Sequence, residues 1–128
     1  MIFDTSAVVA ILLREPGFEA LLEKSARAPA RAIGAPTLTE TAIVLSARLR
    51  SDARGYLARF LHEGAIATVP FTEAHFGTAV DAWLRYGKGR HVASLNFGDC
   101  LSYATARIAG APLLCSGDDF ARTDLPLA

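Results

Sequence analysis

The stretch MIFDTSAVVAILL at residues 1–13 decides the fold. Its apolar start predicts a short buried strand over Met1 to Asp4. Thr5 and Ser6 are favourable helix N-caps, and the apolar run that follows to Leu13 predicts a helix packed against that strand. A strand followed directly by a helix is one unit of an α/β fold.

The same alternation continues along the chain. Stretches that predict strands lie at residues 32–35, 65–69 and 113–115, and patterns that predict helices begin near Phe18, Pro36, Ser51, Thr72 and Asn96. Short apolar strands that alternate with helices predict a parallel sheet with helices on both faces. We therefore expect one α/β domain over residues 1–128, with a central parallel sheet of about four to five short strands flanked by helices.

Composition limits the classes of protein to which the chain can belong. Its 128 residues are 52% hydrophobic and 20% charged, which suits one packed domain and excludes a disordered chain or a coiled-coil rod. The 13 basic and 13 acidic residues balance, unlike those of a strongly basic nucleic-acid binder. No apolar run approaches a membrane span, and the two cysteines match neither a disulfide scaffold nor a metal motif. We therefore expect a cytoplasmic protein with reduced thiols.

Two groups of apolar residues carry further expectations. On the helix after Thr72, the stripe of Phe76, Val80, Trp83 and Leu84 is expected to face the core. The stretches 8–13 and 18–22 hold more apolar residues than one helix face needs. We expect these two stretches to form an interface with another protein or with a second copy of the chain.

Four acids occupy comparable places in the predicted fold. Asp4 and Asp118 follow the first and last strands, and Glu40 and Asp99 lie in the first turns of helices. Each acid alone could be a helix cap or a partner of the helix dipole. Together they fall at the carboxyl ends of parallel strands, where such sheets bind ligands. Four carboxylates in one cleft would repel each other unless a cation neutralised them, and hard oxygen ligands favour Mg²⁺ or Mn²⁺.

Three segments carry a resemblance to a known family. They are IFDTSA at residues 2–7, LNFGDC at 95–100 and LCSGDDFARTD at 114–124, with the Glu40 helix between the first two. In this order they resemble PIN-domain nucleases, specifically the VapC-type toxins of toxin–antitoxin pairs, over the full length of the chain. The opening segment alone is a weak signal, whereas four acids in this order, the GDDF segment and the short chain form a strong one.

The resemblance implies a Mg²⁺- or Mn²⁺-dependent endoribonuclease with the PIN fold. The residues that match the family's metal-binding acids are Asp4, Glu40, Asp99 and Asp118. Thr5 and Ser6 match the hydroxyl residues that orient water or the first carboxylate. The spacing to Phe120 also permits Asp119 as the fourth acid. We prefer Asp118 because it is nearer the strand end. The resemblance also implies a homodimer, a VapB-type antitoxin in the active-site groove, and RNA products with 5′-phosphate and 3′-hydroxyl ends.

The basic residues suit the same substrate class. Without the four acids, thirteen basic residues remain against nine acidic ones, a balance of +4 that favours a polyanion. Lys88 and Arg90, in the glycine-rich loop from Tyr86 to His91, are our candidates for RNA contact, with a simple solvated loop as the alternative. Two other functions remain open: a non-catalytic binding module of the same fold, and a phosphatase that forms a phospho-Asp4. The phosphatase generally needs a second acid two residues after the first, where this chain has Ser6.

Overall fold

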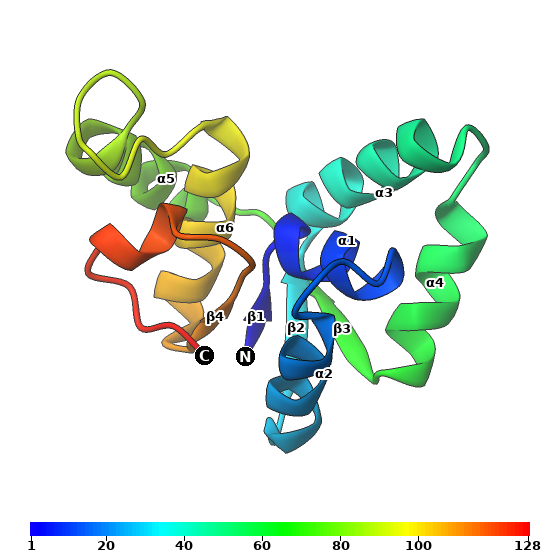
Figure 1. Cartoon of the computed structure of the whole chain (residues 1–128). Helices are drawn as coiled ribbons and strands as arrows, with labels where there is room; N and C mark the ends of the chain where they lie inside the picture. The colour runs from blue at the N-terminus through cyan, green and yellow to red at the C-terminus, as the bar shows by residue number, and fades with distance from the viewer.

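The computed structural model describes all residues 1–128 and contains a four-stranded sheet between two groups of helices (Figure 1). The strands are β1 (Ile2–Phe3), β2 (Arg31–Gly34), β3 (Ile66–Val69) and β4 (Leu113–Leu114). Every neighbouring pair is parallel, and the order across the sheet is β3-β2-β1-β4. The predicted α/β fold with a central parallel sheet is confirmed.

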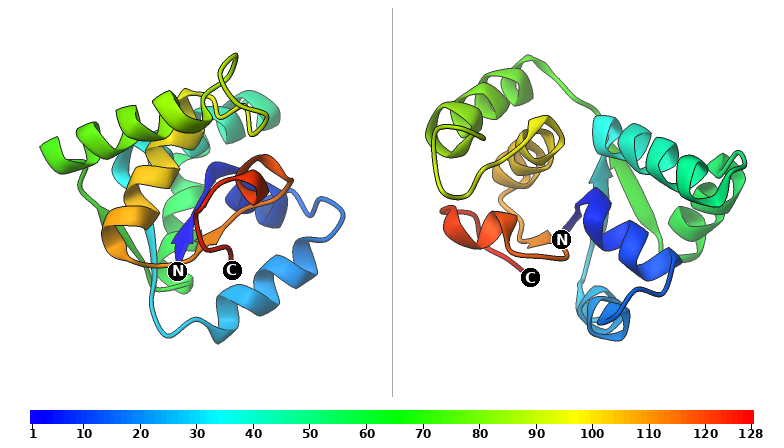
Figure 2. Two further views of the ribbon diagram at one scale, coloured as in Figure 1. Left: turned by 90° about the vertical axis from the view of Figure 1, so that its left-hand side faces the viewer. Right: turned by 45° about the horizontal axis from the view of Figure 1, so that its top comes forward.

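Helices cover both faces of this sheet (Figures 1 and 2). They are α1 (Thr5–Leu12), α2 (Phe18–Arg27), α3 (Ala35–Leu49), α4 (Arg54–Glu63), α5 (Glu73–Tyr86), α6 (Phe97–Ala109) and the 3₁₀ helix η1 (Asp119–Arg122). Helices α5 and α6 pack on one face, and α1, α3 and α4 pack on the other. The short apolar strands β1 and β4 are therefore buried, as strands covered on both faces require, whereas Ala67 and Thr68 of the edge strand β3 remain exposed.

The neighbouring strands β1 and β4 divide their side chains between two separate cores. Ile2 and Leu113 belong to the core beneath α5 and α6, whereas Phe3 and Leu114 belong to the core beneath α1, α3 and α4. Successive residues of a strand point to opposite faces of the sheet, so two residues per strand are enough to anchor both layers.

The apolar residues of α1 are buried rather than available for an interface. Val8, Val9 and Ile11 lie in the core that α1 shares with α2 and α3. Because α1 is covered by the sheet on one side and by neighbouring helices on others, it needs apolar residues around most of its circumference. The expectation that residues 8–13 form an interaction surface is therefore wrong.

In helix α5, large apolar side chains that were expected in the core are instead exposed. Its buried side chains are small alanines, Ala79 and Ala82, together with His75 and Tyr86, whereas Phe76 is 63% exposed and Trp83 is 43% exposed. The alanines let α5 approach α6 closely, and helix packing is then decided by side-chain size rather than by hydrophobicity alone. The stripe from Phe76 to Leu84 thus faces outward, contrary to the sequence-based prediction.

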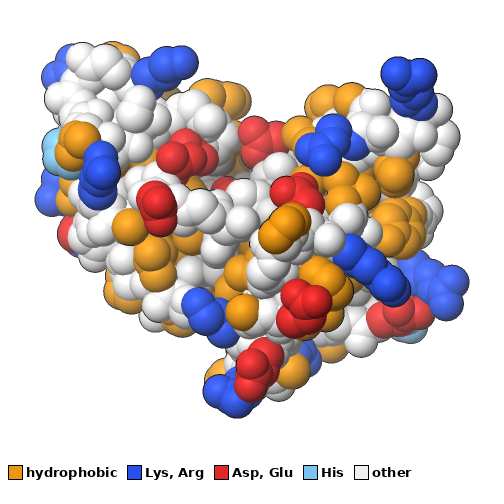
Figure 3. Space-filling model, in the orientation of Figure 1, with side chains coloured by type: hydrophobic (Ala, Val, Ile, Leu, Met, Phe, Trp, Pro, Cys, Tyr) orange, Lys and Arg blue, Asp and Glu red, His pale blue; other side chains and the backbone are white.

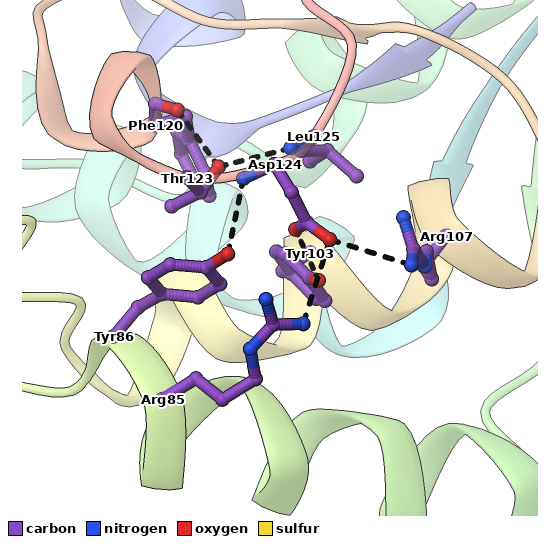
Figure 4. A network of polar contacts seen from close by, with 8 residues as sticks. All are labelled: Arg85, Tyr86, Tyr103, Arg107, Phe120, Thr123, Asp124 and Leu125. Carbon is purple, nitrogen blue, oxygen red and sulfur yellow. Dashed lines mark hydrogen bonds and ion pairs between the residues drawn. The ribbon is translucent and has the colours of Figure 1, made fainter.

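The segment after β4 is fixed by one carboxylate, that of Asp124 (Figure 4). It accepts a hydrogen bond of 2.7 Å from the Tyr103 hydroxyl and forms ion pairs with Arg85 and Arg107. The Asp124 backbone N–H also donates to the Tyr86 hydroxyl. The Tyr103 hydrogen bond, aided by both guanidinium groups, lowers the pKa of Asp124. These contacts attach the C-terminal segment, including η1, to α5 and α6.

Both termini lie beside the amino ends of the strands. The Met1 amino group donates to the Ala30 carbonyl, and the Ala128 backbone N–H donates to the carbonyl of Leu113, the first residue of β4. Figure 2 shows the two ends near each other at one pole of the molecule. None of the helices is both long and apolar enough to span a bilayer.

The contact between β2 and α6 predicts a position that cannot accept a side chain. A Cβ atom on Gly34 would lie 2.6 Å from the Thr105 hydroxyl oxygen, whereas a Cβ on Gly77 of α5 would meet nothing within 4 Å. We expect Gly34→Ala to lower the free energy of unfolding by about 1–3 kcal/mol. Gly77→Ala, the matched control, should raise it by about 0.5–1 kcal/mol, because alanine is the better helix former.

Urea unfolding of both variants would measure these changes. Adding Thr105→Ala to Gly34→Ala should recover much of the loss. A Gly34→Ala protein as stable as the parent would contradict the assigned close contact.

Candidate functional site

A polar cleft opens at the carboxyl ends of the parallel strands, between the two groups of helices. It encloses about 370 Å³. Its acidic lining residues are Asp4, Glu15, Glu40, Asp99 and Asp119. Figure 3 shows acidic side chains around the hollow between the two halves of the molecule and basic side chains on both crests. Three of the four acids singled out in the sequence therefore meet at one place, although they come from three different elements.

Asp4 is the most firmly held of these acids. It follows β1 directly, is buried, and caps the N-terminus of α1. Its Oδ2 accepts hydrogen bonds from the backbone N–H of Ser6 at 2.9 Å and from the Ser6 hydroxyl at 2.6 Å. Its Oδ1 accepts a third bond, 2.6 Å long, from the Ser102 hydroxyl. Helix capping explains the bonds from Ser6, but the bond from α6 has no part in capping.

Glu40 enters the cleft from α3. This helix begins at Ala35, so Glu40 lies in its second turn rather than in the predicted first. The Thr5 hydroxyl donates to Glu40 Oε1 at 2.6 Å, and the Thr41 hydroxyl lies 3.0 Å from the Thr5 oxygen. Gly98 leaves the space that the carboxylate occupies, because a Cβ atom there would lie 2.9 Å from Glu40 Cδ. Glu40 Oε2 accepts no hydrogen bond from the protein.

Asp99 caps the start of α6 and also has a raised pKa. It forms a capping box with Asn96 at the start of α6, in which Asp99 Oδ2 accepts from the Asn96 backbone N–H at 3.0 Å. Burial raises the pKa of Asp99 to about 6, the bond from Asn96 opposes this rise, and the charges of Asp4, Asp119 and Glu40 add to it. The helix-cap interpretation is thus correct for one oxygen, but neighbouring acids disfavour the ionised form.

The structure places Asp119, rather than Asp118, in the lining of the cleft. Both side chains are exposed, but only Asp119 lines the cleft, and its charge contributes to the raised pKa of Asp99. The reason is local geometry: Gly117 has a φ of +89°, and η1 begins at Asp119 after this turn. The preference for Asp118 rested on its distance from the strand end along the chain; the structure places Asp119 nearer the other acids, and the identity of the fourth metal-binding acid stays a prediction.

The cleft offers the carboxylate oxygens that a hard divalent cation prefers as ligands. The acidic residues of the cleft are all aspartates and glutamates, which supply oxygen ligands. Two of their oxygens, Glu40 Oε2 and Asp99 Oδ1, accept no hydrogen bond from the protein. No three His, Cys, Asp or Glu side chains are spaced to hold one ion in this arrangement. Mutual repulsion keeps uncompensated carboxylates apart, and a cation would remove that repulsion.

Three residues that support the acids were missed by the sequence analysis: Thr37, Thr41 and Ser102. All three are buried: the Ser102 hydroxyl contacts Asp4 and Thr37, and the Thr41 hydroxyl contacts Thr5, the partner of Glu40. One signal was available, because Ser102 follows Asp99 by three residues and so shares its face of the helix. Thr37 and Thr41, four residues apart, likewise share a face of α3.

The loop that carries Lys88 and Arg90 is held by a hydrogen bond between its two ends and by contacts with α5. The Lys88 backbone N–H donates to the Leu95 carbonyl, and the Arg90 guanidinium lies 5.0 Å from the centre of the Trp83 ring while its Nε donates to the Leu84 carbonyl. Neither Lys88 nor Arg90 lines the acidic cleft. Arg90 is thus held against α5, whereas the Lys88 side chain is exposed and forms no ion pair.

Comparisons with known proteins agree with the fold. The PIN domain family matches residues 1–125. Ribonuclease VapC36 of Mycobacterium tuberculosis is 46% identical over 126 residues, covering 98% of this chain and 91% of that protein. Ribonuclease VapC of Mycolicibacterium smegmatis is 43% identical over 125 residues, covering 98% of this chain and 97% of its own length.

Solved structures with lower sequence identity share the fold. The crystal structure of VapC20 from Mycobacterium tuberculosis, described as a sarcin–ricin loop cleaving toxin, has a TM-score of 0.78 at 19% identity and covers 100% of this chain and 98% of that one. A toxin–antitoxin complex from Klebsiella pneumoniae has a TM-score of 0.72 at 20% identity, covering 99% of this chain and 95% of that one. The chain therefore belongs to the PIN domain family and, within it, to the VapC ribonucleases.

Proposed function

We propose that this protein is a Mg²⁺- or Mn²⁺-dependent endoribonuclease that acts as the toxin of a toxin–antitoxin pair. The observation that carries the proposal is the convergence of Asp4, Glu40 and Asp99 on one cleft, in a chain whose relatives are named ribonucleases. The raised pKa of Asp99 supports a cation as the missing partner of these acids.

The residues that would hold the cation are Asp4, Glu40, Asp99 and Asp119. When bound, Mg²⁺ or Mn²⁺ supplies a water of lowered pKa and neutralises charge on the scissile phosphate. Ser6 and Thr5 fix the orientation of Asp4 and Glu40 through their hydroxyls. No histidine lines the cleft, so the proposal assigns no proton transfer to histidine and expects products with 5′-phosphate and 3′-hydroxyl ends.

Protein partners are a second part of the proposal. Phe76, Val80 and Trp83 of α5, together with Phe97 and Leu101 of α6, line an apolar groove of about 510 Å³. A neighbouring apolar groove includes Glu40. Exposed apolar surface of this extent supports binding to another protein. We assign the two protein partners of this chain as a VapB-type antitoxin, which would block the cleft, and a second copy in a homodimer.

Substitution of the acids tests the proposed site. Asp4→Asn, Glu40→Gln and Asp99→Asn should each reduce RNA cleavage by roughly 10²-fold or more, because each removes a charge that holds the cation. Asp119→Asn should also lose activity, whereas Asp118→Asn, its neighbour outside the cleft, should stay near the parent. Cleavage of a mixed tRNA, rRNA and mRNA panel with Mg²⁺, with Mn²⁺ and with a chelator would measure this.

Three outcomes would count against the assignment. Equal activity of the parent and Asp99→Asn would identify the cleavage as contamination. A 2′,3′-cyclic phosphate product would contradict the metal-activated water. A folded, metal-loaded protein that cuts no RNA would favour the non-catalytic binding module.

The pH dependence of stability tests the electrostatics of the cleft without RNA. The folded pKa of Asp99, about 6, lies above its ordinary value of 3.8, so the folded state holds this proton more tightly than the unfolded state. Its contribution to stability is complete below about pH 4 and is lost as the pH rises through about 6. In the metal-free protein, Asp99→Asn should therefore be more stable than the parent at pH 7, by about 1–3 kcal/mol, and similar to it at pH 4.

Thermal unfolding in a chelator at both pH values would measure the difference. Addition of Mn²⁺ at pH 7 should stabilise the parent more than Asp99→Asn. An Asp99→Asn protein that is less stable than the parent at pH 7 would contradict the assigned repulsion.

The basic loop yields a further test. Lys88→Glu and Arg90→Glu should weaken RNA binding and flatten its dependence on salt, because each replaces a cation that would contact phosphate. Lys88→Glu is the cleaner change, since Arg90 also holds the loop against Trp83. Lys24→Glu on α2 lies outside the cleft lining and makes the same charge change; it removes a hydrogen bond to the Ala128 carbonyl but should have little effect on RNA binding. Unchanged binding by both loop variants would make this loop a simple solvated connection.

A further inference from the structure

Ser102 is a fully buried serine in the middle of α6, with an exposed fraction of 0%. A hydroxyl buried inside a helix usually donates to a carbonyl of its own helix. Thr105, three residues later, does this: its hydroxyl donates to the Leu101 carbonyl at 3.0 Å. Ser102 instead donates to Asp4 Oδ1 at 2.6 Å, across the end of the sheet. The two buried aliphatic hydroxyls of this helix, those of Ser102 and Thr105, therefore have different kinds of partner.

The proton of Ser102 can be assigned from the distances. Ser102 Oγ lies 2.6 Å from a carboxylate oxygen and 3.2 Å from the Thr37 hydroxyl oxygen. A serine has one hydroxyl proton, and a bond to a charged acceptor is the shorter and stronger of the two. Ser102 therefore donates to Asp4 and accepts from Thr37. Thr37 is itself buried on α3, so it fixes the direction in which the Ser102 proton points.

This bond changes how Asp4 is held. Ser6 supplies two donors, but both act on Oδ2, which leaves the carboxylate free to turn about that oxygen. Ser102 supplies the only donor to Oδ1. Donors on both oxygens, from helices on opposite faces of the sheet, fix the plane of the carboxylate. Glu40 and Asp99, by contrast, each accept hydrogen bonds from the protein on one oxygen only.

We propose that Ser102 is a positioning residue that fixes the plane of the Asp4 carboxylate and thereby sets the affinity of the cleft for its divalent cation. This inference rests on the proposed metal-dependent function. Ser102 acts through Asp4 and touches neither the cation nor RNA. Partners that orient metal ligands in this way typically change metal affinity or activity by about 10–100-fold when they are removed.

The test compares Mn²⁺ affinity among matched variants of the full chain, by electron paramagnetic resonance of free Mn²⁺. Ser102→Ala should weaken binding by about 10–100-fold. Thr105→Ala removes the other buried aliphatic hydroxyl of α6 and should bind Mn²⁺ like the parent. Ser102→Cys is slightly larger than the parent side chain and has a weak donor, and should fall between the parent and Ser102→Ala. It also serves as the test if Ser102→Ala does not fold.

A double variant separates an action through Asp4 from a general structural effect. If Ser102 acts only through this carboxylate, adding Ser102→Ala to Asp4→Asn should cause no further loss of Mn²⁺ affinity. A further loss would overturn the inference, as would equal losses in Ser102→Ala and Thr105→Ala. In RNA cleavage, Ser102→Ala should lower activity at limiting Mn²⁺ and recover part of it at saturating Mn²⁺.

The outcomes also separate this inference from the function on which it rests. If the parent does not bind Mn²⁺, or binds it no better than Asp4→Asn, the proposed metal site is wrong and the role of Ser102 falls with it. If the parent binds Mn²⁺ and Asp4→Asn binds it more weakly, but Ser102→Ala matches the parent, only the role of Ser102 is overturned.

Discussion

The rest of the site depends on one buried carboxylate, that of Asp4. It ends the central strand β1, caps α1 on one face of the sheet, and accepts a hydrogen bond from α6 on the other. Burial of an ionised group is costly unless donors compensate it, and here three donors do so. The two helical layers, each with its own core, are thus joined at the cleft by a polar contact as well as by the sheet.

The functional requirement on this cleft opposes stability. Asp99 is placed where burial and neighbouring acids make its ionised form unfavourable, and its pKa of about 6 expresses that conflict. A structure selected only for stability would replace one of these acids with a neutral residue. Stability is recovered elsewhere, for example at Asp124, whose pKa is lowered because its partners favour the charged form. The chain therefore contains carboxylates that are electrostatically unfavourable as well as favourable, and the unfavourable one lies in the cleft.

The fold and most of the acid set could be predicted from local pattern, because short apolar strands followed by helix caps place Asp4 and Asp99 without any knowledge of tertiary contacts. The predictions failed where the position of a side chain depends on tertiary packing. Which face of α5 points outward could not be predicted. Only the close approach of α5 to α6 makes Ala79 and Ala82, rather than Phe76, the residues that are buried. The choice of Asp119 over Asp118 depends on the turn at Gly117. The role of Ser102 depends on a contact with a residue 98 positions earlier.

The separation of the cleft from the chain termini has a practical consequence. In a parallel sheet every strand begins at one pole and ends at the other, so the residues beside the strand starts, Met1 and Ala128, lie away from the acids at the strand ends. A peptide tag, fluorescent protein or surface tether attached at either end would leave the cleft facing solution. The nearness of the ends would also permit a circularly permuted chain, in which a short linker joins them and new ends open in an exposed loop.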